Sequence, residues 1–508
     1  MSIRAGTRKK ALRLTSPPRV PTSSANDSTE TTQFSHPDLT RVVAVAVPEP
    51  SSRIASIFIG DGGYGAILEA VSETTDRHFH VFATVEKELA AEDLEYLKVK
   101  GCFTLPVERN ELLEGYFRFV HPTFPVIDGH AFLQQYATHG FEGINLLLLW
   151  SIFSVSASYV PTLKRKACKE IYVARAKLLF DLSHENDKIV LVQSSLLLSF
   201  WFADTEDVKQ SWYWTGIAFS IAQTLGLHSE VKPTNVHVPV QQRSFWRNIW
   251  RCCLMRDVWQ AFGRGRPLRI HATSKDSPYS EDASYLFTNL ILHGKRLYSP
   301  GEAAELASMW QSLITISDLL RYIITKKTLS VLEQNSCKIQ SNNKLSVTSS
   351  TPIFIYTHRH LELHRCAALL ALARATGSKE DSEHAADETT IIIEAFLHDN
   401  ITTYAAPTTV PLIVPAIATY LAALKSEDPN TKKLANEKLD IYSQFLTALD
   451  DNYPAASMLK RLFSAAQEAI IGNDTGVSME ENRSVFAKHV DLWYDLEWLG
   501  KEGVFAMP

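Results

Sequence analysis

The sequence predicts an all-α protein, one large multi-helix domain with a disordered N-terminal tail. Two observations carry this prediction. From about residue 88 onward, apolar side chains recur at the spacing of an α-helix almost everywhere, and strand-like runs fall almost only before residue 87. The 508 residues, 45% hydrophobic and 21% charged, are typical of a globular protein with a sizeable core.

Residues 1–55 are predicted to be a disordered basic tail. They are rich in Ser, Thr, Pro and Arg and hold few large apolar residues. The conformational entropy lost on ordering them would therefore exceed the free energy gained by burying apolar surface. The first twenty residues carry six basic side chains and no acidic one. Arg8, Lys9 and Lys10 indicate either a nuclear-import signal or an arm that contacts phosphates. An ordinary basic tail is the alternative.

Residues 56–86 are predicted to be a glycine-bearing linker. Within them Gly60 to Gly65 fit the pattern G-x-G-x-x-G, after a strand-like run at 54–59 and before a helix-like run at 66–71. Glu86 follows a second strand-like run. Its distance in sequence from the glycines is that at which an acidic residue binds the ribose of a dinucleotide. The alternative is therefore a dinucleotide-dependent enzyme, but its site needs a parallel sheet that the helical sequence afterwards does not supply.

Residues 87–475 are predicted to form the helical domain. Asp128 can cap a helix, and residues 189–203 are apolar on nearly all sides, as a central helix should be. From Trp214 to Leu225 an apolar stripe runs toward Gly226, which can end the helix in the left-handed conformation. Further helices are predicted at 170–182, 243–262, 302–326, 354–376, 388–398, 411–425, 434–449 and 455–471, with loops at 334–352 and 377–387.

Two uncharged stretches, 143–163 and 400–424, are long enough to cross a membrane. The first holds four serines, and the second holds Pro407, Pro411 and Pro415. Both are therefore predicted to be core helices, and no membrane partner is expected. Residues 476–508 form a predicted C-terminal tail whose segment 491–499 alternates acidic and bulky apolar residues, either as an activation segment or as a docked helix.

Candidate chemistry is sparse. The net charge of −5 gives no basic field for nucleic acid, and six scattered cysteines indicate reduced thiols in a reducing compartment. His360 and His364 lie one helical turn apart, as zinc ligands can, but Leu361 stands where a metalloprotease has glutamate. The arginines of 243–251 and 264–269 are interpreted as stems packed over aromatic rings and paired with acids. No catalytic, cofactor-binding or metal residue is assigned.

Several segments carry a family resemblance. Residues 116–127 read YFRFVHPTFPVI, residues 214–228 end in Leu-Gly-Leu-His, and Trp246, Trp250, Met-Arg-Asp and Gly-Arg-Pro follow in order. Together they resemble the fungal transcription-factor regulatory domain that follows Zn₂Cys₆ clusters, the cutinase transcription factor beta subgroup above all. The signature residues, each expected to hold shape, are Tyr116, His121, Pro122, Phe124, Pro125, Trp214, Gly226, Leu227, His228, Trp246, Trp250, Arg256, Asp257, Arg266 and Pro267.

The resemblance implies a nuclear regulator of RNA polymerase II transcription and not an enzyme. A binuclear zinc cluster needs two C-x₂-C-x₆-C arms, and these 508 residues contain no C-x₂-C pair. DNA contact is therefore expected only indirectly, or through an N-terminal module missing from this chain. The expected partners are other transcription regulators or coactivators and a possible small-molecule effector.

Overall fold

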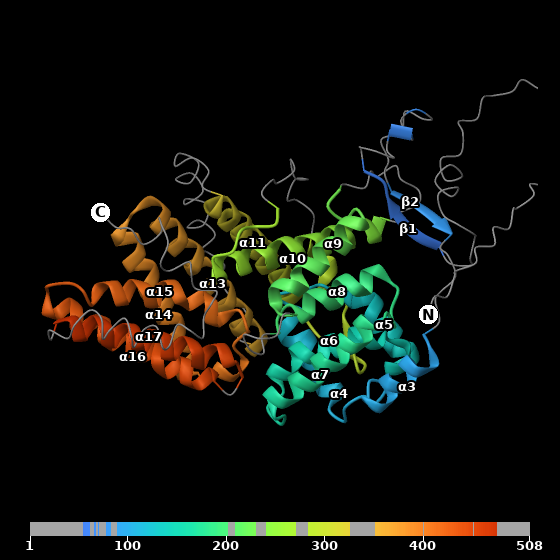
Figure 1. The fold of residues 1–508 in the computed structure, drawn as a ribbon, viewed down its shortest axis with the longest axis horizontal. Coiled ribbons are helices and arrows are strands. Elements are labelled where there is room, and N and C mark those ends of the chain that lie inside the picture. The colour runs from blue at the N-terminus through green and yellow to red at the C-terminus, as the bar shows by residue number, and fades with distance from the viewer. Residues whose placement is uncertain are drawn as a thin grey trace, which may run out of the picture.

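The computed structural model describes residues 54–60, 66, 67, 70, 78–82, 89–201, 209–229, 240–270, 283–325, 351–399, 401–450 and 452–474. These residues form an all-α fold, as predicted, with two small two-stranded sheets. Helices α3 to α9 gather at one end and α14 to α17 at the other, with α10, α11 and α13 between them (Figure 1). A single hydrophobic cluster runs from Leu97 to Phe463 through both ends.

The first helices set a sharp change of chain direction. After α3 (Ala91–Val99), α4 (Arg109–Gly115) continues into a π-helical turn at Tyr116–Val120, and His121-Pro122 ends it. Because Pro122 has no N–H to continue the helical hydrogen bonds, the helix ends here. Asp128 then accepts a hydrogen bond from Ala131 N and caps α5 (Gly129–His139), as predicted.

Helices α6 (Leu146–Ser156) and α8 (Lys188–Leu198) form the centre of the first group. Asn145 and Asp187 cap them, and α6 is buried from Leu147 to Ser156. On α6, Ser151 and Ser156 donate to carbonyls of the preceding turn, so these two hydroxyls are satisfied in an apolar surrounding. The prediction of core helices is confirmed here, although α8 ends five residues before the predicted 203. Helix α7 (Arg165–Asp181) lies between them in sequence and begins five residues before the predicted 170.

Among the described residues, none of the helices is by itself long and apolar enough to cross a membrane. One bent pair, Gly129–Gly143 with Leu146–Tyr159, meets that length and composition at an angle of 104°.

Helix α9 (Ser211–Thr224) ends as the sequence predicts. Gly226 has a φ of 73°, and the N–H of Leu227 returns to the carbonyl of Ala222 at 2.9 Å. This left-handed termination satisfies carbonyls that the end of a helix leaves open.

Strands β1 (Ile54–Phe58) and β2 (His78–Phe82) pair with each other in antiparallel register. A dinucleotide-binding unit requires parallel strands joined by a crossover helix, so the structure contradicts the sheet on which the enzyme alternative depends. Gly60 follows β1, while Asp61 to Gly65 lie outside the described residues. The ordered pair also shows that part of the predicted linker 56–86 docks: His78 Nε2 lies 3.1 Å from the carbonyl of Gly226.

Long helices complete the fold. Helix α10 spans Val240–Arg264, α11 spans Pro300–Ile324 and α13 spans Pro352–Thr376. Helices α14 (Lys379–His398), α15 (Thr409–Ala423), α16 (Pro429–Leu449) and α17 (Pro454–Asp474) follow. Each agrees with a predicted helix to within a few residues, except α14.

The predicted loop at 377–387 is wrong beyond its first two residues. Gly377 has a φ of 73° and ends α13, and Ser378 then caps α14 by accepting from Asp381 N. Glu380 and Asp381 in the first turn favour a helix start, because acids stabilise the N-terminal end of the dipole. The short antiparallel pair β3 (Ile291–Leu292) and β4 (Lys295–Arg296) was also not predicted.

Three predictions fall outside the described residues. They are the basic cluster Arg8, Lys9 and Lys10 in the N-terminal tail, residues 334–350 of the predicted polar loop, and the acidic and aromatic segment 491–499.

Candidate functional site

His121, Pro122 and Pro125 of the signature lie inside the core. His121 is fully buried among Tyr116, Phe117 and Phe287, with Nε2 3.0 Å from the carbonyl of Leu286. Burial lowers the pKa of His121 to about 4, so the ring is neutral at physiological pH. This arrangement holds the turn in place and presents no reactive group to solvent.

A buried polar network connects the same turn to the middle of the molecule. The amide of Asn248 donates to the carbonyl of Pro125 at 2.6 Å and accepts from Trp310 Nε1 at 3.1 Å. Gln193 donates to the carbonyl of Val126 at 3.1 Å. Because buried polar groups are costly when unpaired, these bonds fix the register of α8, α10 and α11 against the turn.

Asp257 is fully buried and pairs with Arg269, as the arginine interpretation predicts. One carboxylate oxygen lies 2.9 Å from Nη1 of Arg269, and the other accepts from the Arg269 backbone N–H at 3.0 Å. The Arg269 guanidinium stacks over Trp212, 3.6 Å from the ring centroid. Arg266 lies over the same ring at 5.3 Å.

The remaining signature residues have structural positions. Trp214 and Trp246 are buried, and Trp250 packs against Phe219 and His228. Leu227 is buried beside Gly226, whereas His228 and Pro267 are exposed.

His360 and His364 are packed in the core and are not arranged as metal ligands. His364 Nδ1 donates to the carbonyl of His360 at 2.6 Å, and the ring meets Trp259 edge-on. His360 Nε2 accepts from Ala406 N at 3.1 Å. Among the described residues, no three His, Cys, Asp or Glu side chains are grouped to hold a metal ion.

A cavity of about 420 Å³ lies between the two groups of helices. One wall comes from α6, α7 and the start of α9, a second from α10 between Arg256 and Arg264, and a third from α15 and the first turns of α17. Helix α10 lies in the middle of the molecule, between the two ends (Figure 1). We call this space the interhelical cavity.

Most residues lining the interhelical cavity are apolar, yet four are basic. Phe200, Trp201, Phe262 and the prolines of α15 form apolar surface. The basic residues are Lys169, Arg256, Arg264 and Arg374, and no Asp or Glu lines the cavity among the residues that the structure describes.

Arg256 is held by neutral groups. Its Nε donates to Ser199 Oγ at 2.8 Å, its Nη2 donates to Ser199 O and to Ser211 Oγ, and the guanidinium lies over Phe200 at 4.0 Å. Burial lowers the pKa of Arg256 to about 9, with the nearby charge of Arg264 as the smaller cause. The sequence identified Arg256 as a signature residue but not as part of a cavity wall.

Lys169 is only 4% exposed. Its Nζ donates to the carbonyl of Asn452 at 3.1 Å and lies 4.5 Å from the centre of the Tyr453 ring. Burial, together with the charge of Arg165, lowers the pKa of Lys169 to about 7. The predicted helix began at residue 170 and therefore left Lys169 out.

Two acceptor atoms beside these cations have no partner. Oε1 of Gln260 and Oδ1 of Asn452 are buried and accept no hydrogen bond, and both residues line the interhelical cavity. The cavity therefore combines apolar walls, the buried cations Lys169 and Arg256, and two acceptors that need a donor. Such a combination can bind a small molecule.

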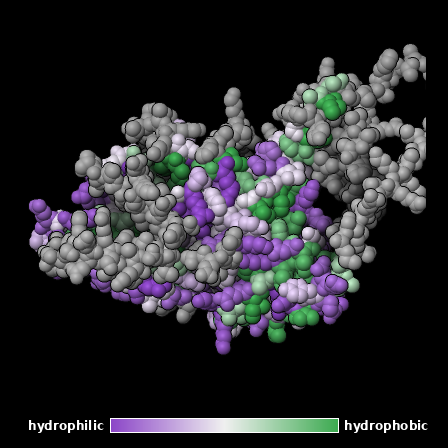
Figure 2. Space-filling model, in the orientation of Figure 1, coloured by the Kyte–Doolittle hydropathy of each residue, from purple (hydrophilic) through white to green (hydrophobic). Residues whose placement is uncertain are grey.

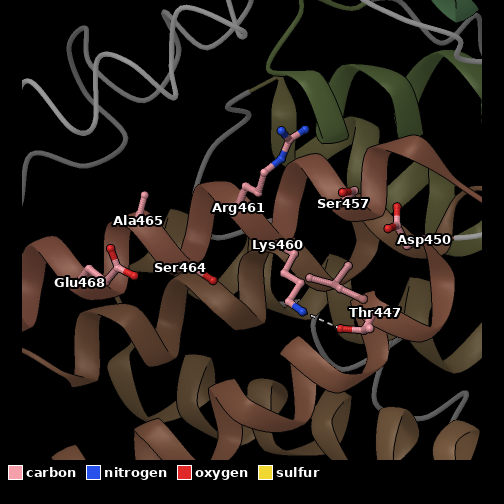
Figure 3. A pocket seen from close by; sticks show the side chains of 9 residues that line it. Thr447, Asp450, Ser457, Lys460, Arg461, Ser464, Ala465 and Glu468 are labelled. Atoms are coloured by element: carbon pink, nitrogen blue, oxygen red, sulfur yellow. Dashed lines mark hydrogen bonds between the residues drawn. The ribbon is translucent and has the colours of Figure 1, made fainter.

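A second hollow of about 370 Å³ lies on the surface between α16 and α17 (Figure 3). Lys460 donates to Thr447 Oγ1 at 2.7 Å across it, and Asp450, Arg461 and Glu468 line it as exposed side chains. Exposed charges of both signs are an ordinary solvated surface. On the face drawn in Figure 2, hydrophobic residues gather toward the end formed by α3 to α8, interrupted by hydrophilic ones.

Comparison with known proteins identifies the helical region. Residues 113–351 match the family described as fungal specific transcription factor domain, so the chain carries this domain, as the sequence resemblance predicted. Helices α13 to α17 lie beyond the match.

The curated relatives agree with this identification. The chain is 35% identical to cutinase transcription factor 1 beta of Fusarium vanettenii over 39% of this chain and 24% of the relative. It is 30% identical to cutinase transcription factor 1 alpha of the same species over 37% of this chain and 22% of the relative. It is 34% identical to the acetamidase regulatory protein of Aspergillus oryzae over 34% of this chain and 22% of the relative. The chain therefore matches less than a quarter of the length of each of these relatives.

Proposed function

Since residues 113–351 form a fungal specific transcription factor domain, we propose that this protein is a regulator of transcription in the nucleus. The family match carries the proposal, and the names of the relatives support it. The arrangement of the signature residues is compatible with it, because they pack as scaffold and place no catalytic group.

The protein acts on promoters through other proteins or through a further DNA-binding module. The 508 residues contain no C-x₂-C pair for a binuclear zinc cluster, and the net charge of −5 provides no wide basic field. The partners are other transcription regulators or coactivators. In a mobility-shift assay with promoter fragments, the purified protein should show no sequence-specific retention, and specific retention would contradict this indirect mode.

A tethering experiment tests the proposal. The full chain is fused to an unrelated DNA-binding domain and directed to a reporter promoter in a fungal cell. We expect reporter expression to change several-fold, in either direction, relative to the DNA-binding domain alone. A matched fusion with Asp257→Ala, which removes the buried partner of Arg269, should lose the effect. A well-expressed wild-type fusion that leaves the reporter unchanged would contradict a role in transcription.

A further inference from the structure

The interhelical cavity has the dimensions of a small-molecule site. Its volume of about 420 Å³ lies within the range of roughly 300–1,000 Å³ that is usual for ligand pockets. It lies between segments that are distant in sequence, with α6, α7 and α10 on one side and α15 and α17 on the other. A molecule in it would contact both groups of helices at once.

The lining favours a ligand with an apolar body. Phe200, Trp201 and Phe262 contribute aromatic surface opposite α15. On α15 and just before it, Pro407, Pro411 and Pro415 recur at four-residue spacing and all line the cavity, so one face of this segment carries no backbone N–H at those positions. Burying apolar ligand surface against such walls is favourable in proportion to the area removed from water.

The charges favour an anion. Burying a cation is costly unless an opposite charge or hydrogen bonds compensate it. Arg256 has only hydroxyl, carbonyl and ring partners, and Lys169 has one carbonyl and one ring. The neighbouring acid, Asp257, is already bonded to Arg269. Within the described part of the chain, Lys169 and Arg256 are thus two buried cations of the cavity that have no carboxylate partner.

We propose that the interhelical cavity binds a small organic carboxylate with an apolar body, its charge placed against Lys169 and Arg256. The unpartnered acceptors Gln260 Oε1 and Asn452 Oδ1 add two positions where a hydroxyl of the ligand, or a water, would donate. The proposal concerns binding alone. A bound carboxylate would couple the two helix groups, and its regulatory meaning rests on the proposed function.

The experiment is calorimetric titration of the purified full chain with decanoate, which has the proposed chemistry and dissolves as a monomer. We expect saturable one-to-one binding. 1-Decanol keeps the alkyl chain but lacks the charge. Its affinity should be lower than that of decanoate by about tenfold or more, since each charge-assisted hydrogen bond is worth on the order of a factor of ten. Decyltrimethylammonium should not bind. Absence of decanoate binding, or equal binding of decanoate and decanol, would overturn the proposal.

Variants locate the site. Lys169→Met should weaken decanoate binding about tenfold or more and leave decanol binding unchanged. The matched control is Lys460→Met, which removes a lysine from the exposed surface hollow and should leave both affinities unchanged. Arg256→Gln should show the same loss; because Arg256 also bonds to Ser199 and Ser211, its fold is checked by thermal melting. If Arg256→Gln does not fold, the comparison of Lys169→Met with Lys460→Met tests the site. Equal decanoate affinity in these two variants would show that decanoate binds elsewhere.

The binding measurement and the reporter measurement are independent. Failure of decanoate to bind would contradict the proposed ligand and would not affect the result of the tethering experiment. Failure of the tethered reporter would remove the regulatory role and leave a measured affinity standing.

Discussion

Among the buried residues of the signature, Asp257 is a charged side chain whose two carboxylate oxygens are both paired. Asp257 has no exposed surface and receives a backbone N–H and a guanidinium from one partner, Arg269. Because Arg269 lies after α10 and pairs with Asp257, this buried charge fixes the path of that segment over the ring of Trp212. The sequence could predict this pairing, because Met-Arg-Asp and the following arginines are close in the chain. It could not show that Arg256 faces the other way, toward a cavity made with α15.

Asp257→Ala should destabilise the protein. It removes a buried carboxylate and leaves Arg269 without its counter-charge, which costs about 3–5 kcal/mol when a buried pair is broken. Urea unfolding followed by circular dichroism measures the change. Asp440→Ala is the control, because Asp440 is exposed on α16 and should alter the free energy of unfolding by less than about 0.5 kcal/mol. Equal effects of both substitutions would contradict the assigned role of Asp257.

Buried histidines should make the protein sensitive to acid. Burial lowers the pKa of His360 to about 3 and of His121 and His364 to about 4, against 6.5 in the unfolded chain. The unfolded state therefore binds more protons below pH 6.5, so stability is present above this pH and is lost as pH falls toward 4. Each histidine contributes a slope of about 1.4 kcal/mol per pH unit in this window.

His364→Phe tests that origin. Phenylalanine keeps an aromatic ring against Trp259 but has no proton to bind, so the loss of stability between pH 6.5 and 4 should become shallower by about 1.4 kcal/mol per pH unit. The free energy of unfolding at several pH values measures it. His130→Phe, at an exposed position, is the control and should keep the wild-type slope. An unchanged slope in the His364 variant would show that other groups govern acid unfolding.

At the scale of elements, helix ends were the most predictable features. Gly226 ends α9 and Asp128 starts α5 because local backbone chemistry decides both. The start of α14 was missed since Gly377 also marks a loop in sequence, and only the cap by Ser378 shows that a helix follows directly. The start of α7 was missed because Arg165, Lys166 and Lys169 leave no apolar period in its first turns, although the fold buries Lys169.

Gly226→Ala should lower the free energy of unfolding by more than the left-handed backbone conformation at this position would by itself. A Cβ there would lie 2.3 Å from the ring of Phe58 and 2.7 Å from Nε2 of His78, so it would displace the β1–β2 pair from α9. Gly377→Ala is the matched control, with the same φ of 73° and no atom within 4 Å. It should cost about 1 kcal/mol from the left-handed backbone alone. Thermal melting of both variants measures the difference, and equal costs would show that the strand pair does not dock on Gly226.

At the scale of the whole molecule, the interhelical cavity depends on contacts that sequence patterns do not encode. Lys169 meets Asn452 across 283 positions of the chain. The helices α15 and α17 that complete the cavity lie beyond the residues that match the transcription factor domain. Periodicity could predict each of these helices, but it holds no information on which faces meet. The fold class was therefore predictable and the cavity was not.

The charged surroundings of Lys169 determine how pH acts on the cavity. Arg165 lies on the same helix, the Tyr453 ring covers the amine, and Arg256, Arg264 and Arg374 line the same space. Burial raises the pKa of Tyr453 well above its usual value, so this phenol stays neutral. Lys169, with its pKa lowered to about 7, is then the group of this set whose charge changes near neutrality.

Decanoate affinity should consequently fall as pH rises through 7. Below pH 7 the amine is already charged and binds the carboxylate directly; above it, binding must first add a proton to Lys169, so affinity weakens by up to about tenfold per pH unit. Calorimetry at pH 8 in two buffers of different ionisation enthalpy should show uptake of close to one proton per bound decanoate. Lys169→Met should bind weakly at every pH with no proton uptake. A wild-type affinity that stays constant from pH 6 to 9 would contradict the placement of the carboxylate against this lysine.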